Sequence, residues 1–329
     1  MRRIAASFIV LVLSGFLGTL QGQVPAPIHG VTVEDTHDVT TEPFQTQVVT
    51  ALGNLTVGPT TRIVFTPPRP AGDYQAATAR ISTVSYIMGL PVDCSSMSSI
   101  SVSNYLTRFK DYVATLGSNV DIWEICNECN GDWLGNSSDV AAKLAEAYDY
   151  VKGQGKVAAS TPYQFPTLNS SCVSNPSYDM LTWAKKDSNV PQRIKQGVVY
   201  VLVSYYNDSC SPPQPEPNWK TLFANLATIF PNAKLGFGEI GWSTNTPPSV
   251  TNRTALIKHF YGLRKNLPIT VPNYVDGYFY WEFSLDMVPW TKQLWNVINP
   301  AMANQQWVYE SGGLAGNLTP FRHTRMIKL

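Results

Sequence analysis

The sequence predicts a single (β/α)₈ barrel, and three observations support this fold. Short apolar runs rich in β-branched residues alternate with helical patterns along the 329-residue chain. About eight such pairs occupy about 300 residues, which is the count of a barrel. No glycine-rich phosphate loop follows the first strand, whereas a doubly wound open sheet would favour one. About 45 residues follow the last strand, so we expect no separate C-terminal β-domain.

The predicted strands are short, and proline or glycine lies at most of the joins. They cover residues 30–34, 61–65, 84–90, 120–126, 156–160, 198–204, 234–239 and 277–283. Amphipathic patterns predict helices over 102–116, 139–152, 218–230 and 252–266, with Asn218 and Asn252 as N-caps of the last two. Segment 41–52 and the eighth helix are weakly patterned, and the residues after 283 predict mostly loop.

The composition excludes several classes of protein. Charged residues make up 14% of the chain, against about 25% for an average soluble domain, which argues against a disordered chain. The formal net charge is +1 and no basic run is present, so we expect no nucleic-acid partner. The four histidines are scattered, and we expect neither a metal nor an organic cofactor. A hydrophobic content of 44% suffices for a sizeable core. We expect the chain to be a monomer.

The N-terminus has the pattern of a secretory signal peptide. A basic start at Met1, Arg2 and Arg3 precedes apolar residues 4–20, and Gly22 offers a small residue for cleavage. We therefore expect a signal peptide over 1–22, a catalytic domain over 23–329 and a secreted, periplasmic or extracellular location. The alternative is an uncleaved membrane anchor. Nothing in the mature chain is long and apolar enough to span a bilayer.

Five cysteines fit export, and their odd number leaves at least one thiol unpaired. Cys172 and Cys210 lie in successive polar loops, so we expect them to form a disulfide. Cys94 and Cys129 follow successive strands, and we expect these to pair as well. Cys126 is then left as a core thiol. Cys126 and Cys129 have the spacing of a redox motif, but they lie at the end of a strand and not at the start of a helix, so we expect no redox function.

Two glutamates lie at the ends of predicted strands. Glu128 follows the fourth strand, and Glu239 ends the seventh. In a barrel of this kind the carboxyl ends of the strands surround the mouth where chemistry occurs. Two carboxyl groups on opposite sides of one mouth are the apparatus of glycoside hydrolysis. Gly238 and Gly241 flank Glu239, and we expect them to let a sugar ring approach closely.

The segment Trp-Glu-Ile-Cys-Asn-Glu-Cys-Asn over 123–130 resembles the Trp-Glu-Ile-x-Asn-Glu-Pro-Asn segment of clan A glycoside hydrolases. These retaining (β/α)₈ enzymes carry the acid/base on strand four and the nucleophile on strand seven. The resemblance implies that Glu128 is the acid/base and Glu239 the nucleophile. It also implies that Asn127 hydrogen-bonds the 2-hydroxyl of the sugar.

Aromatic residues near the strand ends are candidates for substrate binding. The resemblance implies that Tyr205 or Tyr206, after strand six, contacts the nucleophile. It also implies that Trp281 on strand eight forms the floor of the −1 sugar site. Trp242 and Trp133 fall in or near loops that follow strands, where an aromatic face could cover a sugar ring.

The chain departs from the clan pattern at three places. Cys129 replaces the usual proline, and strand three ends at Asp93 without the histidine that many members carry. Arg69 follows strand two, and the sequence alone does not align it with the arginine of the clan. Glu124 has the same strand parity as Glu128, so we expect it inside the barrel, paired with an arginine or lysine.

The sequence therefore predicts an exported retaining glycoside hydrolase that cleaves β-glycosidic bonds of a polysaccharide or oligosaccharide. In a retaining enzyme the two carboxyl groups lie roughly 5–5.5 Å apart. Two alternatives stay open at this point. One is a non-catalytic carbohydrate-binding barrel, and the other is a transglycosylase that remodels a cell-surface glycan.

Overall fold

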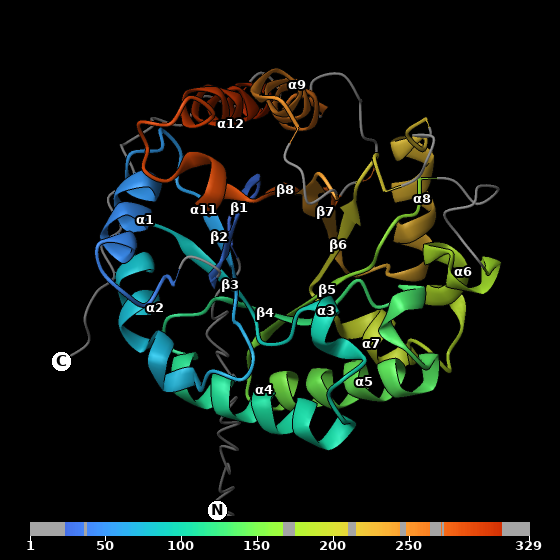
Figure 1. Cartoon of the computed structure of the whole chain (residues 1–329). Helices are drawn as coiled ribbons and strands as arrows, with labels where there is room; N and C mark the ends of the chain where they lie inside the picture. The colour runs from blue at the N-terminus through green and yellow to red at the C-terminus, as the bar shows by residue number, and fades with distance from the viewer. Residues whose placement is uncertain are drawn as a thin grey trace, which may run out of the picture.

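The computed structural model describes residues 24–35, 38–166, 175–209, 215–243, 248–263, 271 and 273–310. Within these residues the chain forms a closed barrel of eight parallel strands, in which each strand pairs with the next and β8 pairs with β1. Helices surround the barrel on its outer side (Figure 1). The predicted (β/α)₈ barrel is confirmed. The expected signal peptide and the expected Cys172–Cys210 disulfide lie outside the described residues.

Every predicted strand is present, and the observed ends differ from the predicted ones by two residues at most. The strands are β1 (Ile28–Glu34), β2 (Thr60–Val64), β3 (Tyr86–Leu90), β4 (Ile122–Asn127), β5 (Val157–Thr161), β6 (Tyr200–Tyr205), β7 (Lys234–Gly241) and β8 (Asp276–Trp281). Their side chains are almost all buried, because one face packs inside the barrel and the other against helices.

The helices with strong amphipathic patterns form where the sequence predicts them. These are α4 (Val102–Leu116), α5 (Ser137–Gly153), α8 (Trp219–Ile229) and α9 (Val250–Tyr261). In α8 the side chain of Asn218 accepts a hydrogen bond from the backbone N–H of Thr221, as expected of an N-cap. The expected cap at Asn252 is wrong. Helix α9 begins earlier, and Ser249 caps it by accepting from the N–H of Asn252.

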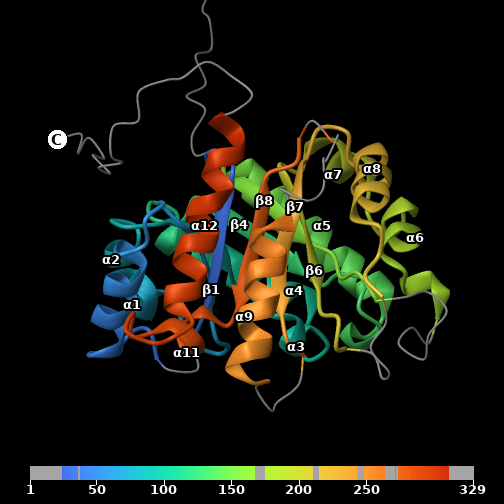
Figure 2. The same cartoon turned by 90° about the horizontal axis from the view of Figure 1, so that it is seen from above.

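The remaining helices are shorter or weakly patterned. They are α1 (Phe44–Gly53), α2 (Gln75–Ile81), α3 (Cys94–Met97), α6 (Met180–Lys185), α7 (Gln192–Gly197), α11 (Phe283–Met287) and α12 (Trp295–Glu310), with short 3₁₀ turns η2 (Ala71–Tyr74), η3 (Asp132–Leu134) and η4 (Pro176–Tyr178). The prediction of loop after residue 283 is wrong. Helix α12 tolerates Pro300 because Trp295, Ile298 and Met302 bury one face, and it lies alongside α9 (Figure 2).

The interior of the barrel divides into an apolar and a polar part. Met88, Ile122, Leu202 and Phe279 belong to one buried cluster that fills the end where the strands begin. Polar side chains lie further along the same strands, toward their carboxyl ends. A filled lower barrel leaves chemistry to the carboxyl ends. No helix in the described ranges has the length and apolar character needed to span a membrane.

Candidate active site

The two glutamates lie close together at the carboxyl ends of their strands. Glu128 directly follows β4, and Glu239 belongs to β7. Ser204 of β6 is the register partner of Glu239, and its hydroxyl donates a hydrogen bond of 2.6 Å to Glu128 Oε1. Ser204 therefore lies on the strand next to Glu239 and contacts Glu128, and both carboxyl groups are buried.

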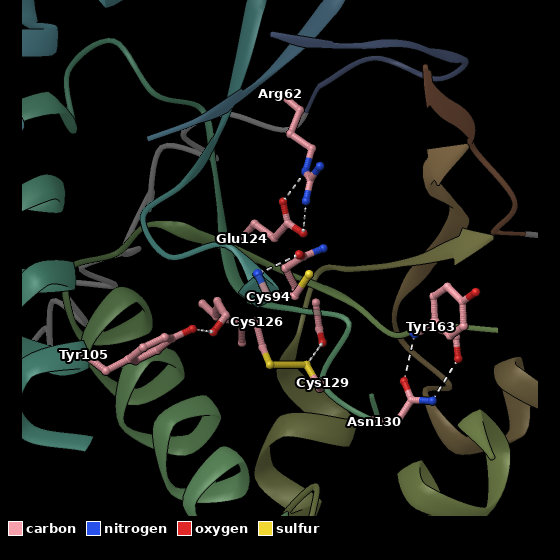
Figure 3. The surroundings of a disulfide bond; sticks show 11 residues. Arg62, Cys94, Tyr105, Glu124, Cys126, Cys129, Asn130 and Tyr163 are labelled. Carbon is pink, nitrogen blue, oxygen red and sulfur yellow. Dashed lines mark hydrogen bonds and ion pairs between the residues drawn. A yellow bond between two sulfur atoms is a disulfide. The ribbon is translucent and has the colours of Figure 1, made fainter. Parts of the chain in front are cut away.

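The carboxyl group of Glu239 has a cation and a hydroxyl as partners. Arg62 of β2 donates from Nη1 to Glu239 Oε2 at 2.5 Å, and the Tyr206 hydroxyl donates to Oε1. Arg62 is fully buried and also holds Glu124 through two hydrogen bonds of 2.6 and 3.1 Å (Figure 3). The expected pairing of Glu124 with a barrel cation is confirmed. A carboxyl group with a cation and a hydroxyl donor is stabilised in its ionised form.

The surroundings of the two glutamates act differently on their proton affinities. Burial and the charge of Glu239 together raise the pKa of Glu128 to about 8, against the opposing hydrogen bonds from Ser204 and Cys94. Burial also raises the pKa of Glu239, but Arg62 and Tyr206 oppose that rise. Since the cation contacts Glu239, the proton of the pair resides on Glu128 near neutral pH.

Asn127, the last residue of β4, offers a free donor beside the glutamates. Its Oδ1 accepts a hydrogen bond of 3.1 Å from the backbone N–H of Cys94. Its Nδ2 is buried and has no hydrogen-bond partner among the described residues. Buried polar atoms are nearly always paired, so an orphaned donor at this position is suited to a ligand oxygen.

The structure distinguishes the two tyrosines that end β6. Tyr206 points toward the barrel axis and contacts Glu239. Tyr205 points outward, where its ring lies 4.9 Å from that of Trp219 and 6.2 Å from that of Phe260. The expectation that Tyr205 binds substrate is therefore wrong. Successive residues of a strand alternate between its two faces, so only one of the two can reach the mouth.

A group of aromatic side chains, which we call the aromatic wall, lies beside the carboxyl pair and consists of Tyr163, Phe165, Tyr206, Trp281 and Trp133. Tyr163, Phe165 and Tyr206 form a buried cluster against which Trp281 packs. Trp133 extends this wall outward, because its ring lies 5.2 Å from Tyr163 and 6.1 Å from Phe165 and its side chain is 42% exposed. Trp281 and Trp133 therefore belong to the same group of aromatic side chains as Tyr206, and their contact with substrate stays a prediction.

Tyr163 is held in this wall by Asn130, two residues beyond Glu128. Asn130 accepts from the backbone N–H of Tyr163 at 2.7 Å and donates to its carbonyl oxygen at 2.8 Å (Figure 3). Trp242 lies elsewhere. It lines a separate groove of about 380 Å³ with Glu216 and His259, so the structure does not bring it to the glutamates.

The cysteines near Glu128 pair differently from the prediction. Cys126 forms a disulfide with Cys129, and Cys94 is a free thiol (Figure 3). The expected Cys94–Cys129 disulfide is wrong, as is the expected core thiol at Cys126. The reason lies in the turn after β4. Glu128 has a φ of 53° and folds the chain back, which brings the Cα atoms of Cys126 and Cys129 to 5.7 Å, within disulfide range.

The glycines beside Glu239 have a different role from the predicted one. A Cβ atom on Gly238 would lie 2.7 Å from Thr161 Cγ2 and 2.8 Å from Leu202 Cβ. A Cβ atom on Gly241 would lie 2.6 Å from the carbonyl oxygen of Trp281. The space beside these glycines is filled by neighbouring strands, so glycine is required for strand packing and not for approach of a sugar.

Arg62 and Ser204 are site residues that the sequence reasoning missed. A signal for Arg62 was present, because an arginine in the middle of a short buried strand must find a counter-charge. Arg69, which follows β2, instead donates to Asp38 at 2.8 Å and lies 3.6 Å from Asp35. Arg62, and not Arg69, is the β2 arginine that contacts Glu239.

Solved structures share this fold at low sequence identity. A beta-glucosidase from Exiguobacterium marinum matches with a TM-score of 0.55 and 11% identity, over 87% of this chain and 100% of that one. A GH5-4 broad specificity endoglucanase from an uncultured bacterium matches with a TM-score of 0.54 and 12% identity, over 85% and 94%. An FMN-binding beta-glucuronidase from Facaelibacterium prausnitzii L2-6 gives 0.49 and 13%, and this chain covers 38% of its length.

No protein-family model matches the chain, and a search of curated proteins finds no relative. The structural likenesses therefore concern the fold. The closed barrel and its neighbours fit the clan A (β/α)₈ glycosidases that segment 123–130 resembles.

Proposed function

We propose that this chain is an exported retaining glycoside hydrolase that cleaves β-glycosidic bonds of a polysaccharide or oligosaccharide. One observation carries the proposal: two buried glutamates share one barrel mouth and have unlike partners. Glu128 accepts from the hydroxyl of Ser204, whereas Glu239 binds Arg62 and Tyr206. Such a pair supplies one protonated and one ionised carboxyl group for the same reaction.

In the first step, Glu239 attacks the anomeric carbon while Glu128 donates its proton to the departing glycosidic oxygen. The glycosidic bond breaks, and a covalent glycosyl-enzyme forms on Glu239. Arg62 and Tyr206 orient the Glu239 carboxylate and keep it ionised before the attack. The high pKa of Glu128 ensures that a proton is present to be donated.

In the second step, Glu128 is ionised and removes a proton from water, which attacks the anomeric carbon and releases Glu239. The orphaned Nδ2 of Asn127 supplies a donor to a sugar hydroxyl. Trp281 and Trp133 present aromatic surface to the apolar faces of the sugar rings.

Export is part of this proposal, and the Cys126–Cys129 disulfide supports it. Disulfides of this kind persist in oxidising compartments and are rare in the cytosol. Expression of the full chain with its N-terminus intact tests export directly. We expect an exported product that begins near residue 23, and a product confined to the cytoplasm with Met1 still attached would contradict this part.

The experiment that tests the activity measures reducing ends released from β-linked glucans, mannans, xylans and galactans. We expect turnover on one class, and loss of at least about a thousandfold in Glu128→Gln and Glu239→Gln. Glu146→Gln is the matched control, because Glu146 is an exposed residue of α5. It should retain full activity.

Product analysis separates the proposal from its alternatives. Proton NMR of the first product should show retention of anomeric configuration, and inversion would contradict the double displacement. Products longer than the substrate would indicate a transglycosylase. Binding of a glycan without turnover in the wild type would indicate a non-catalytic carbohydrate-binding barrel.

A further inference from the structure

The glutamate assigned as acid/base lies inside a disulfide-closed ring. Cys126, Asn127, Glu128 and Cys129 are consecutive, and a disulfide joins the first to the last (Figure 3). Both residues between the cysteines belong to the candidate site, since Glu128 accepts from Ser204 and Asn127 presents its orphaned donor. The disulfide therefore closes a ring that contains the site residues Asn127 and Glu128 themselves.

The backbone of Glu128 needs external support. Its φ of 53° lies in the left-handed region, which costs a non-glycine residue about 1–2 kcal/mol. Such a conformation persists only where the surroundings fix it, and it is common at functional sites. The N–H of Glu128 donates to the carbonyl of Thr161 at 2.5 Å, and its carbonyl accepts from the N–H of Gly131 at 2.7 Å. These two hydrogen bonds hold the peptide groups on either side of the Glu128 Cα.

The disulfide restrains the backbone rotation within the turn that the two hydrogen bonds of Glu128 do not restrain. Cys126 is fully buried in β4, which is anchored by a 2.8 Å hydrogen bond from Tyr105 of α4 to the carbonyl of Ile125. Cys129 is buried too, with its Sγ 3.5 Å from the hydroxyl of Ser160. A covalent bond between these two points limits rotation within the turn, and with it the direction in which the Glu128 side chain leaves the backbone.

A third cysteine lies beside this ring, and its thiol forms a hydrogen bond with Glu128. The N–H of Cys94 donates to Asn127 Oδ1 at 3.1 Å. Burial and the nearby carboxyl groups of Glu128 and Asp93 raise the pKa of the Cys94 thiol, so the thiol stays protonated. Thiol–disulfide exchange requires a thiolate, so the disulfide and the free thiol can coexist.

We propose that Cys126 and Cys129 are positioning residues, and that their disulfide holds Glu128 in the left-handed turn that directs its carboxyl group at Ser204 and the barrel mouth. This inference rests on the proposed role of Glu128 as the acid/base. Reduction by dithiothreitol breaks the sulfur–sulfur bond, adds two electrons and two protons to give two thiols, and oxidises dithiothreitol to its cyclic disulfide. The turn then keeps its hydrogen bonds but loses the covalent link between its two ends, and Glu128 gains rotational freedom.

The test compares the full chain before and after reduction. Reduction should lower kcat by about tenfold or more with KM changed less than about twofold, because a misplaced acid/base impairs the chemical step more than binding. Removal of dithiothreitol under air should restore kcat. Circular dichroism should stay unchanged throughout, which separates positioning from unfolding.

The double variant Cys126→Ala/Cys129→Ala is the matched control. It should show the lowered kcat permanently and should not respond to dithiothreitol. If this variant fails to fold, the reversible response of the wild type still tests the proposal. Equal kcat, KM and pH profile in the oxidised and reduced wild type would overturn it. So would alkylation of both cysteines in the purified chain before any reduction.

A second readout separates this proposal from the proposed function. The ¹³C resonance of the Glu128 carboxyl group, assigned by its loss in Glu128→Gln, reports its titration without any substrate. We expect reduction to lower the pKa of Glu128 toward its ordinary value, because a freed side chain reaches solvent. If no glycan is hydrolysed but this shift occurs, positioning stands and the proposed function fails. An unmoved titration would overturn the positioning role.

Discussion

Substitution of Tyr206 by phenylalanine tests the nucleophile assignment most directly. The change removes one hydroxyl, which donates to Glu239 Oε1, and keeps the ring in the cluster with Tyr163 and Phe165. The fold should therefore survive. Glu239 retains its contact with Arg62 but loses its neutral donor.

The magnitude follows from the type of hydrogen bond that is lost. A hydrogen bond to a charged group contributes about 1.5–3 kcal/mol, which corresponds to a loss in kcat/KM of about 10- to 150-fold. The hydroxyl of Tyr206 lowers the pKa of Glu239. Its removal raises that pKa, so more of the nucleophile is protonated at low pH. The acid limb of the kcat/KM profile should therefore move to higher pH.

Tyr205→Phe provides an internal control of the same chemistry. Tyr205 is the neighbouring residue, points outward and has a hydroxyl without a partner among the described residues. Its loss should change neither kcat/KM nor the pH profile. Activity within about twofold of wild type in Tyr206→Phe, or an equal loss in both variants, would refute the assignment of Glu239 as the nucleophile held by Tyr206.

Three other substitutions test the cation that supports the buried carboxyl groups, the proton on Glu128 and the aromatic surface offered to the substrate. Arg62→Met should lower the free energy of unfolding by about 3–5 kcal/mol, because two buried carboxyl groups lose their shared cation; urea denaturation measures this, and a loss below about 1 kcal/mol would contradict it. The native state holds a proton on Glu128 up to about pH 8, whereas the unfolded chain releases it near the ordinary value of 4.5, so wild-type stability falls as pH rises between these values. Glu128→Gln cannot ionise, and its melting temperature should rise relative to wild type across that window; parallel curves would refute this. Trp133→Ala should raise KM on the preferred glycan about 2- to 10-fold at unchanged kcat, because the loss concerns an exposed ring. An unchanged KM would place Trp133 outside the substrate path.

Local sequence patterns predicted most of the fold. The strands were predictable because they are short apolar runs rich in β-branched residues, and the long helices because their burial follows a period of 3.6 residues. The helix α12 was missed because Pro300 and a weak pattern obscured its buried face, which forms only through packing beside α9. The N-cap of α9 was misplaced for a related reason: both Ser249 and Asn252 are good capping residues, and tertiary packing selects between them.

The site was predictable where the strand ends carried reactive groups. Glu128 follows β4 and Glu239 lies near the end of β7, so their meeting at the mouth follows from parallel topology alone. The choice between Tyr205 and Tyr206 depends on strand parity: Ser204 faces the barrel interior, so Tyr205 faces outward and Tyr206 inward. Both residues are tyrosines, so residue type does not distinguish them, and only the contact between Ser204 and Glu128 shows which face of β6 lines the mouth.

The sequence by itself determined the barrel, the order of its strands and the two glutamates at the ends of β4 and β7, because these depend on local periodicity and on topology. Only the tertiary structure decided the partners of those glutamates. Arg62 and Ser204 come from strands far away in the chain, and the Cys126–Cys129 disulfide depends on a left-handed turn at Glu128. Contacts between distant strands are fixed by register and backbone geometry, which emerge only when the barrel closes.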